Sequence, residues 1–534
     1  MRLVTVHQMR ELESQADKNG LTYERMMANA GLETARAVHQ RYFSRQSHRV
    51  IGLIGSGNNG GDTLVALAHL VAWGWHTQAY LVKERGKNDA LTEAYLKAGG
   101  KLLPAGEGGD FPALREGIIE SDVLLDGILG TGAKLPLKKE IQDVLACILT
   151  IPDKPVVIAV DCPSGVDCDS GEAAPECLPA ELTICMAAVK QGLLRQSALK
   201  LCGEILAVDI GLPGNLPAWQ EAGTEVVDAN LAAAWLPDRP ADSHKGTFGT
   251  CLIAAGSINY CGAALLASQA AYRVGAGLVR TAIPGAIYDA LAGSLPETTW
   301  LILPHTLGVL NAEGARIVGQ NLERVSCMLL GPGWGLEEET LAFLKQLFGD
   351  SGAGNQMGFD MVQGKRARNE SVNLPHLVID ADALKLLARI DHWEKKIGFA
   401  VLTPHPGEMA VLTGLPVEKI QADREKIACE YAAKWGQVVV LKGALTIIAA
   451  PDGRRALIPV ANSALAKAGT GDVLAGMITG YVAQGVEAFN AAALAAWLHA
   501  RAGVAAARRI GTPAAVAAGD LIAAIPLVIK QIGG

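Results

Sequence analysis

Apolar and polar residues along the chain follow the pattern of an α/β protein. Short apolar runs such as VIGLIG (50–55) and VVIAVDC (156–162) predict buried strands. Between such runs, longer segments carry apolar residues at helical spacing, as in the stretch from about Thr5 to Tyr42. This alternation predicts mostly parallel sheets with helices on both faces.

The pattern divides the chain into two parts. A chain of 534 residues is too long for one hydrophobic core. Between residues 211 and 242 the alternation gives way to proline, glycine and charge, and it starts again at GTFGTCLIAAGS (246–257). We therefore expect two α/β domains, at residues 1–221 and 222–534. The polar, aperiodic segment 350–371 is predicted to be a surface insertion.

Composition narrows the class of protein. The chain contains no apolar run of the roughly 18 residues that a membrane span needs, and its N-terminal segment lacks a signal-peptide core. The ten cysteines form no C-x-x-C pair, which favours buried, reduced thiols over a disulfide or metal framework. A net charge of −7 without a basic cluster argues against nucleic acid as a partner. We expect a cytoplasmic protein with neither a membrane nor a nucleic-acid partner.

Three loops of the first half follow predicted strands: GSGNNGGD (55–62), DGILGTGAKLP (126–136) and DCPSGVDCDSG (161–171). Parallel sheets bind ligands at the carboxyl ends of their strands, and glycines let the main chain approach a phosphate. No Lys-Ser or Lys-Thr follows the first loop, so it is not a Walker A motif. Asn59, Asp126 and Ser164 offer only oxygen atoms, which suits a hard cation such as K⁺. The alternative is that the Asn and Ser side chains merely cap their turns, and spacing alone favours this alternative.

The first half resembles the epimerase domain of the NAD(P)H-hydrate repair enzymes. The resemblance rests on RMMANAG (25–31) and on the three loops, and it covers residues 1 to about 212. It implies a Rossmann-like α/β/α sandwich with K⁺ at Asn59, Asp126 and Ser164. The resemblance also places substrate at Asp161 and at two loops: Asn58, Asn59, Gly60, Gly61 and Asp62, and then Gly130, Thr131, Gly132, Ala133, Lys134, Leu135 and Pro136. Ala28 departs from the family, in which glutamate is common at this position.

Asp161 is the candidate proton shuttle of this domain. A partly desolvated carboxylate at a strand end can exchange a proton with the hydrated nicotinamide ring or with its hydroxyl group. Either reversible ring opening or water loss would then scramble the stereocentre, and the sequence leaves both routes open.

The second half contains AGTGD (468–472), where a loop is expected to enter a helix. The N–H groups of Thr470 and Gly471 would bind an anion, and Asp472 would accept a proton from a hydroxyl group during phosphoryl transfer. The alternative is that Asp472 is an N-cap. Three further motifs follow strands: GPGWG (331–335), TPHPGE (403–408) and LKGALT (441–446).

These motifs, together with HKGTFG and DADAL, resemble the ribokinase-like ADP-dependent NAD(P)H-hydrate dehydratases over residues 222–534. The resemblance implies a ribokinase-like α/β/α domain that uses ADP with Mg²⁺, and Asp472 as the general base. Lys385 stands where the family often has asparagine. The resemblance places the hydrate at Ala263, Gly333, His405 and Asp472, and ADP at Lys442, Gly443, Ala444, Leu445, Thr446 and Gly471.

Together the two halves predict a bifunctional repair enzyme. The first domain would interconvert the R and S forms of hydrated NADH and NADPH, and the second would return the S form to NAD(P)H. Two alternatives stay open: a vitamin-precursor kinase fused to a nucleotide-binding domain, and a first domain that only binds its ligand. We also expect a homo-oligomer.

Overall fold

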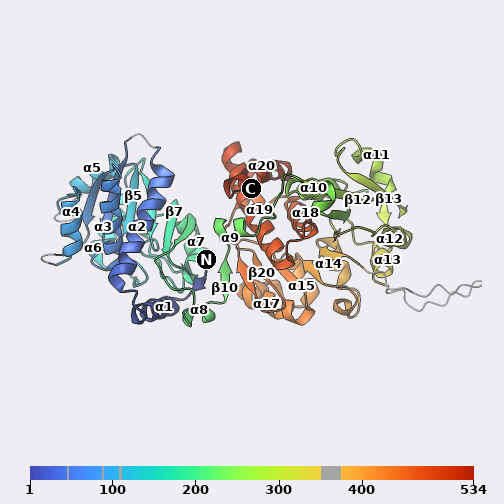
Figure 1. Cartoon of the computed structure of the whole chain (residues 1–534), viewed down its shortest axis with the longest axis horizontal. Helices are drawn as coiled ribbons and strands as arrows, with labels where there is room; N and C mark the ends of the chain where they lie inside the picture. Colours follow the sequence, from blue (N-terminus) through green and yellow to red (C-terminus); the bar gives the residue numbers. More distant parts are fainter. Residues whose placement is uncertain (45–46, 87–88, 107–110, 350–373, 534) are drawn as a thin grey trace, which may run out of the picture. The chain divides into compact units, whose positions relative to one another are not determined.

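A computed structural model describes residues 1–44, 47–86, 89–106, 111–349 and 374–533. The chain forms two compact units, Met1–Val226 and Val227–Gly534 (Figure 1). The segment 350–371, which the sequence predicts to be an insertion, lies outside the described residues.

The described part of the N-terminal unit contains a parallel seven-stranded sheet with the order β4-β3-β2-β5-β6-β7-β9. A two-residue strand, β1 (Leu3–Val4), pairs separately with β8 (Val189–Lys190). The sheet strands are β2 (Arg49–Ile54), β3 (His76–Leu81), β4 (Lys101–Leu102), β5 (Val123–Gly127), β6 (Val156–Val160), β7 (Leu182–Met186) and β9 (Glu204–Val208). The helices are α1 (Val6–Lys18), α2 (Tyr23–Tyr42), α3 (Asn58–Ala72), α4 (Ala90–Lys97), α5 (Pro112–Ile119), α6 (Lys139–Leu149), α7 (Gln196–Cys202) and α8 (Ala218–Glu221).

Alternating strand residues build a core on each face of this sheet. Val50 and Ile54 of β2 pack into one core together with residues of α1, α2 and α3. Ile51 and Leu53 point to the opposite face and pack with residues of α5 and α6. Since successive side chains of a strand point to opposite faces, two helical layers enclose the sheet. The predicted Rossmann-like three-layer sandwich is confirmed.

The C-terminal unit contains a mainly parallel sheet with the strand order β21-β20-β19-β18-β17-β16-β11-β12-β13. In this part of the sheet, β20 pairs antiparallel with both β19 and β21. The strands are β11 (Thr250–Ala254), β12 (Leu278–Pro284), β13 (Thr299–Leu303), β16 (Cys327–Leu330), β17 (His376–Ile379), β18 (Ala400–Leu402), β19 (Val438–Leu441), β20 (Ile447–Ala449) and β21 (Arg455–Leu457).

The helices of this unit lie around the sheet (Figure 1). Cys251 and Ile253 of β11 pack into a core with α10, α18, α19 and α20. Leu252 points to the opposite face and is also buried, so both faces are covered, as the sequence pattern predicts. The helices are α9 (Ala229–Ala234), α10 (Gly262–Arg273), α11 (Tyr288–Leu291), α12 (Ala312–Gly319), α13 (Glu338–Leu347), α14 (Asp382–Leu387), α15 (Pro406–Thr413), α16 (Val417–Ala422), α17 (Arg424–Trp435), α18 (Thr470–Ala483), α19 (Ala488–Ile510) and α20 (Ala518–Gln531).

Some local expectations are confirmed and others need correction. The helical stretch Thr5–Tyr42 is two helices, because Thr5 caps α1 in a capping box and Thr22 caps α2. All ten cysteines are free thiols, and Cys261 and Cys429 are the two that are not fully buried. Within the described ranges, no helix is both long and apolar enough to cross a membrane.

Candidate active sites

The first candidate site lies at the carboxyl ends of β2, β5 and β6, where α3 begins. Helix α3 starts at Asn58, so residues of the glycine loop form its first turn. The N-cap residue, Gly57, has no side chain to cap the helix. Among the described residues, the N–H groups of Asn58, Asn59 and Gly60 have no hydrogen-bond partner. A helix start with free N–H groups is suited to binding a phosphate.

Close main-chain contacts explain two of the glycines in this loop. A Cβ atom on Gly55 would lie 1.9 Å from the carbonyl oxygen of Ile128, and one on Gly60 would lie 2.1 Å from the carbonyl oxygen of Gly55. No side chain fits at such distances, so Gly55 lets the loop after β2 pack against the loop after β5, and Gly60 lets the first turn of α3 pack against Gly55.

The three predicted cation ligands lie together. Ser164 Oγ donates a hydrogen bond to Asp126 Oδ1 at 2.5 Å, and the Ser164 N–H donates to Asp126 Oδ2 at 2.8 Å. Asn59 Nδ2 donates to the carbonyl oxygen of Leu129 at 2.8 Å, while Asn59 Oδ1 is buried without a hydrogen-bond partner in the described structure. Burial raises the pKa of the Asp126 carboxyl group above its ordinary value. A buried, unsatisfied oxygen and a buried carboxylate fit a cation that prefers oxygen ligands.

Asp161 faces the same region from the end of β6. Its backbone has φ = 66°, which is rare for a residue with a side chain, and its N–H donates to the carbonyl oxygen of Ile184 at 2.7 Å. A Cβ atom on Gly130 would lie 3.3 Å from Asn59 Cβ and 3.6 Å from Asp161 Oδ2, so the three loops meet as predicted.

A pocket of about 580 Å³ opens between these loops and helices α1 and α2. Seven of the predicted substrate residues line it: Asn58, Asn59, Asp62, Gly130, Thr131, Gly132 and Asp161. Six others do not: Gly60, Gly61, Ala133, Lys134, Leu135 and Pro136.

The pocket also contains polar residues that the sequence analysis missed. Glu13 of α1 and Lys190 of β8 line it, and burial raises the pKa of Glu13. Burial also raises the pKa of Asp62 well above its ordinary value, and the negative charge of Asp161 raises it further. Arg85 Nη1 donates to the carbonyl oxygens of Gly55 and Gly57, at 2.7 and 2.9 Å, and so braces the loop before α3.

The second candidate site lies at the start of α18. The N-cap of this helix is Gly469, with φ = 88°, and Asp472 is its third residue, so the N-cap interpretation of Asp472 is wrong. The predicted pair of free N–H groups also needs correction, because the Thr470 N–H donates to Lys467 O at 3.4 Å. In the described structure, the N–H groups of Gly471 and Asp472 have no partner and are free to bind an anion.

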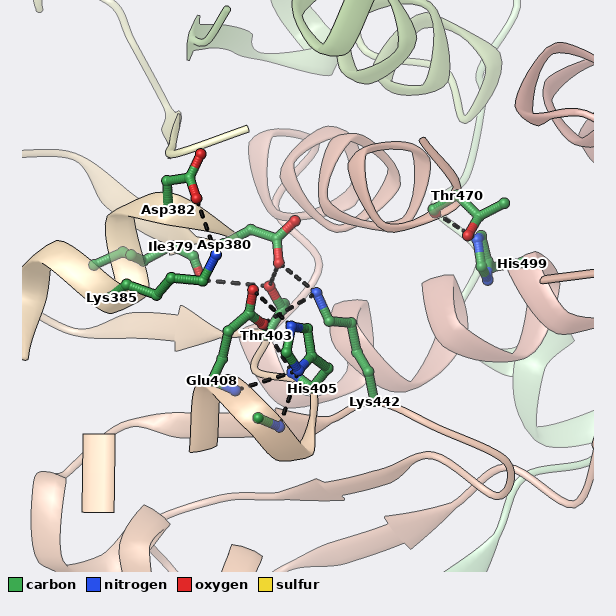
Figure 2. A network of polar contacts seen from close by, with 11 residues as sticks. Ile379, Asp380, Asp382, Lys385, Thr403, His405, Glu408, Lys442, Thr470 and His499 are labelled. Carbon is green, nitrogen blue, oxygen red and sulfur yellow. Dashed lines mark hydrogen bonds and ion pairs between the residues drawn. The ribbon is translucent and has the colours of Figure 1, made fainter. Parts of the chain in front are cut away.

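Asp380, at the end of β17, organises a polar network next to this helix (Figure 2). Its Oδ1 accepts hydrogen bonds from Lys442 Nζ and from Thr403 Oγ1, both at 2.6 Å, and the Asp380 side chain is 1% exposed. Burial alone would lower the pKa of Lys442, but the charges of Asp380 and Glu408 raise it. Lys442 therefore stays protonated. Its Nζ lies 3.7 Å from the position that a Cβ atom on Gly471 would take, so the ammonium group lies beside the start of α18.

Asp472 is poised to exchange protons near neutral pH. Burial and the nearby charge of Asp380 raise its pKa to about 7, although Lys442 opposes the shift. A carboxyl group with this pKa is suited to general base catalysis. His499 of α19 supports the same turn, since its Nε2 donates to the carbonyl oxygen of Thr470 at 2.8 Å (Figure 2). Burial lowers the pKa of His499 to about 4, so this histidine stays neutral.

His405 is the N-cap of α15, and Glu408 lies in the first turn of this helix, close to Lys442 (Figure 2). His405 Nδ1 accepts hydrogen bonds from the Gly407 and Glu408 N–H groups at 3.0 and 3.2 Å, so it caps the helix. The His405 side chain is still half exposed, which leaves it free to contact a ligand. Burial raises the pKa of Glu408 to about 7. The ammonium group of Lys442 opposes this shift, because its Nζ lies 3.8 Å from Glu408 Oε2.

The remaining predicted residues of this unit fall into two groups. Ala263 and Gly333 are neighbours, since a Cβ on Gly333 would lie 2.8 Å from Ala263 Cβ. The segment Gly443–Thr446 connects β19 to β20, where Leu445 has φ = 59° and Thr446 Oγ1 donates to Gly443 O at 3.0 Å. Lys385, the departure from the family pattern, forms an ion pair with Asp382 at 3.0 Å.

The sequence contained weak signals for the residues that it missed. Asp380 and Glu408 lie in the motifs DADAL and TPHPGE, but the sequence does not show that they meet Lys442. His499 lies in an apolar helical segment with no motif of its own. Lys190 directly follows the apolar run LTICMAAV, where an unpaired lysine would be costly.

The folds and sites define a class of protein: a two-domain α/β enzyme that handles phosphorylated ligands in both domains. A family model described as NAD(P)H-hydrate dehydratase matches residues 251–527, and one described as YjeF-related protein N-terminus matches residues 23–192. The bifunctional NAD(P)H-hydrate repair enzyme Nnr of Moorella thermoacetica is 36% identical, over 100% of this chain and 97% of that protein. The chain belongs to the family of bifunctional NAD(P)H-hydrate repair enzymes.

A second full-length relative agrees with this assignment. The enzyme of the same name from Salinibacter ruber is 34% identical, over 96% of this chain and 93% of that protein. Among solved structures, an ADP/ATP-dependent NAD(P)H-hydrate dehydratase from Bacillus subtilis, co-crystallized with ATP/Mg²⁺, is 31% identical, with a TM-score of 0.47. That comparison covers 58% of this chain and 99% of the other.

Proposed function

We propose that this chain repairs hydrated NADH and NADPH, with an epimerase in the unit Met1–Val226 and an ADP-dependent dehydratase in the unit Val227–Gly534. Family membership over the full length supports both activities. The single structural observation that carries the proposal is the raised pKa of Asp472, about 7, beside the free N–H groups of Gly471 and Asp472. The vitamin-precursor kinase alternative is not favoured by the family matches.

In the epimerase, the free N–H groups at the start of α3 would bind a phosphate of the dinucleotide. Asp161 would exchange a proton with the hydrated ring, which the loops at Gly130 and Asn59 would hold against it. Asn59 Oδ1, Asp126 and Ser164 would hold K⁺, because they form a buried oxygen set with one unsatisfied acceptor. K⁺ would supply positive charge that offsets the buried Asp126 carboxylate.

In the dehydratase, Asp472 would take the proton of the ring hydroxyl group as its oxygen attacks the β-phosphoryl group of ADP. AMP leaves, and the phosphorylated ring then loses phosphate together with a proton of the neighbouring ring carbon to give NAD(P)H. The N–H groups of Gly471 and Asp472 and the Lys442 ammonium would stabilise the phosphoryl oxygens. His499 would hold the turn through its hydrogen bond to Thr470.

Mg²⁺ takes one or two carboxylates together with phosphate oxygens and waters. Glu408, whose Oε2 lies 3.8 Å from Lys442 Nζ, offers a ligand of this kind and leaves Asp472 free to act as the base. Mg²⁺ would neutralise charge on the nucleotide phosphates. A homo-oligomeric state and a cytoplasmic location stay predictions from the sequence.

The test follows absorbance at 340 nm after the full chain is mixed with both epimers of NADH hydrate, ADP, Mg²⁺ and K⁺. Full recovery of NADH with equal formation of AMP is expected. The Asp161→Asn variant should form only as much NADH as the S epimer in the mixture can give, after spontaneous epimerisation is subtracted. The Asp472→Asn variant should bind ADP but recover NADH about 100-fold more slowly or worse.

A variant of an exposed acid, Asp452→Asn, serves as the control and should behave as wild type. Wild-type protein that recovers no NADH with ADP or ATP would overturn the repair function. Recovery of the S share alone by wild type would overturn the epimerase half.

A further inference from the structure

Lys190 is a buried lysine in the wall of the N-terminal pocket. It ends β8 and lines the pocket, yet its side chain is only 1% exposed. Lysine is almost never fully buried unless it is paired, since removing an ammonium group from water is costly. The position therefore requires a specific partner.

That partner is Asp161. Lys190 Nζ donates a short hydrogen bond to Asp161 Oδ1 and a second bond to the carbonyl oxygen of Met186 at 3.2 Å. The Met186 N–H also donates to Asp161 Oδ1, at 3.2 Å. Oδ1 is thus held by two donors, the N–H of the last residue of β7 and the ammonium group of β8.

The second oxygen of Asp161 has a different environment. In the described part of the chain, Oδ2 has no hydrogen-bond partner, and it lies 3.6 Å from where a Cβ on Gly130 would be. Gly130 begins the loop that also lines the pocket. One carboxylate oxygen is therefore anchored and the other is presented to the ligand.

The charges around this pair come from several elements. Glu13 and Arg10 face the pocket from α1, Asp62 faces it from α3, and Arg85 adds positive charge near Asp62. The thiols of Cys168 and Cys185 lie close to Lys190. Burial raises the pKa of Glu13 and of Asp62, which favours their neutral forms, whereas Asp161 has the Lys190 ammonium in direct contact. Glu24 of α2 also lines the pocket, and the Lys190 ammonium is the cation in direct contact with Asp161.

We propose that Lys190 is a positioning residue of the epimerase, which fixes Asp161 Oδ1 so that Oδ2 faces the reacting carbon of the hydrated ring. This inference rests on the proposed epimerase function. It assigns to Lys190 the orientation of Asp161, without contact to the substrate.

The test compares Lys190→Met and Lys190→Arg with wild-type full chain. A matched control is Lys139→Met, since Lys139 is 80% exposed and pairs with Asp143 on the surface of α6. The R epimer of NADH hydrate is supplied, and its conversion to the S epimer is followed by chromatography across a pH series, without ADP. Dehydration of the S epimer with ADP is measured separately as a reference.

In the Lys190→Met variant, kcat for epimerisation should fall about 100-fold or more while KM stays within about threefold, since only the proton shuttle is displaced. The acid limb of its pH profile should move to higher pH, because a carboxyl group without its cation ionises less readily. Lys190→Arg keeps the charge, so its acid limb should stay in place while kcat falls moderately. Lys139→Met should match wild type, and all variants should dehydrate the S epimer normally.

Unchanged kcat in Lys190→Met, or a lowered kcat with no movement of the acid limb, would overturn the role of Lys190. If Lys190→Met does not fold, the Lys190→Arg profile decides, and a wild-type kcat in that variant would overturn the proposal. Wild-type chain that fails to convert the R epimer would instead overturn the epimerase function itself.

Discussion

Neutralising Asp380 should lower the stability of the C-terminal unit. The Asp380 side chain is 1% exposed, and its Oδ1 accepts from Lys442 Nζ and Thr403 Oγ1, both at 2.6 Å. The Asp380→Asn variant keeps an oxygen that can accept one of these bonds but leaves the Lys442 ammonium without its closest negative charge. Glu408 Oε2, at 3.8 Å from Lys442 Nζ, compensates in part for the lost negative charge of Asp380.

The size of the effect follows from these contacts. Breaking a buried ion pair by removing one partner costs about 3–5 kcal/mol. Because asparagine keeps an acceptor and Lys442 is 18% exposed, we expect the lower end, about 3 kcal/mol. For a unit of this size, each kcal/mol shifts Tm by about 2 °C, so Tm should fall by about 6 °C.

Differential scanning calorimetry of the full chain measures this shift. The control is Asp452→Asn: Asp452 pairs with Arg454 at 2.8 Å, but both side chains are about half exposed. An exposed pair contributes about 0–1 kcal/mol, so the control should melt close to wild type. An Asp380→Asn protein that melts together with the control would refute the view that this buried pair stabilises the unit.

Three further predictions concern the two sites and the helix packing. Dehydratase kcat/KM should rise with pH through about 7 and then level off, because Asp472 acts as a base only when deprotonated; a profile flat between pH 5 and 9 would contradict this role. Replacing K⁺ by tetramethylammonium should slow epimerisation of the R form and leave S-form dehydration unchanged, whereas equal rates in both salts would argue against a cation at Asn59 and Asp126. Gly476→Ala should destabilise the chain by about 1–3 kcal/mol in urea unfolding, since its Cβ would lie 2.2 Å from the carbonyl oxygen of Ala267. Gly262→Ala, with open space around the new Cβ, is its control and should cost nothing.

The sequence predicted both folds because the relevant signals are local. Apolar runs alternating with helical spacing gave the two α/β units, and three glycine-containing loops after strands marked where a ligand would bind. The start of α3 at Asn58 carries no capping signal in the sequence, since its N-cap residue, Gly57, has no side chain. Asp472 was open to an N-cap interpretation for the same reason: Gly469 holds that position through its backbone conformation.

The sequence by itself determined the fold class, the family and the loops that carry the candidate sites. Only the tertiary structure decided which charges meet. Lys442 and Asp380 are 62 residues apart, and they meet because the parallel strands β17 and β19 bring their carboxyl ends to one edge of the sheet. Lys190 and Asp161 are 29 residues apart, and they meet because β8, outside that sheet, places Lys190 beside the end of β6. Hydrophobic periodicity reports which face of a strand is buried, but it contains no information on strand order. The partners, ionisation and orientation of the candidate catalytic carboxylates depend on that order.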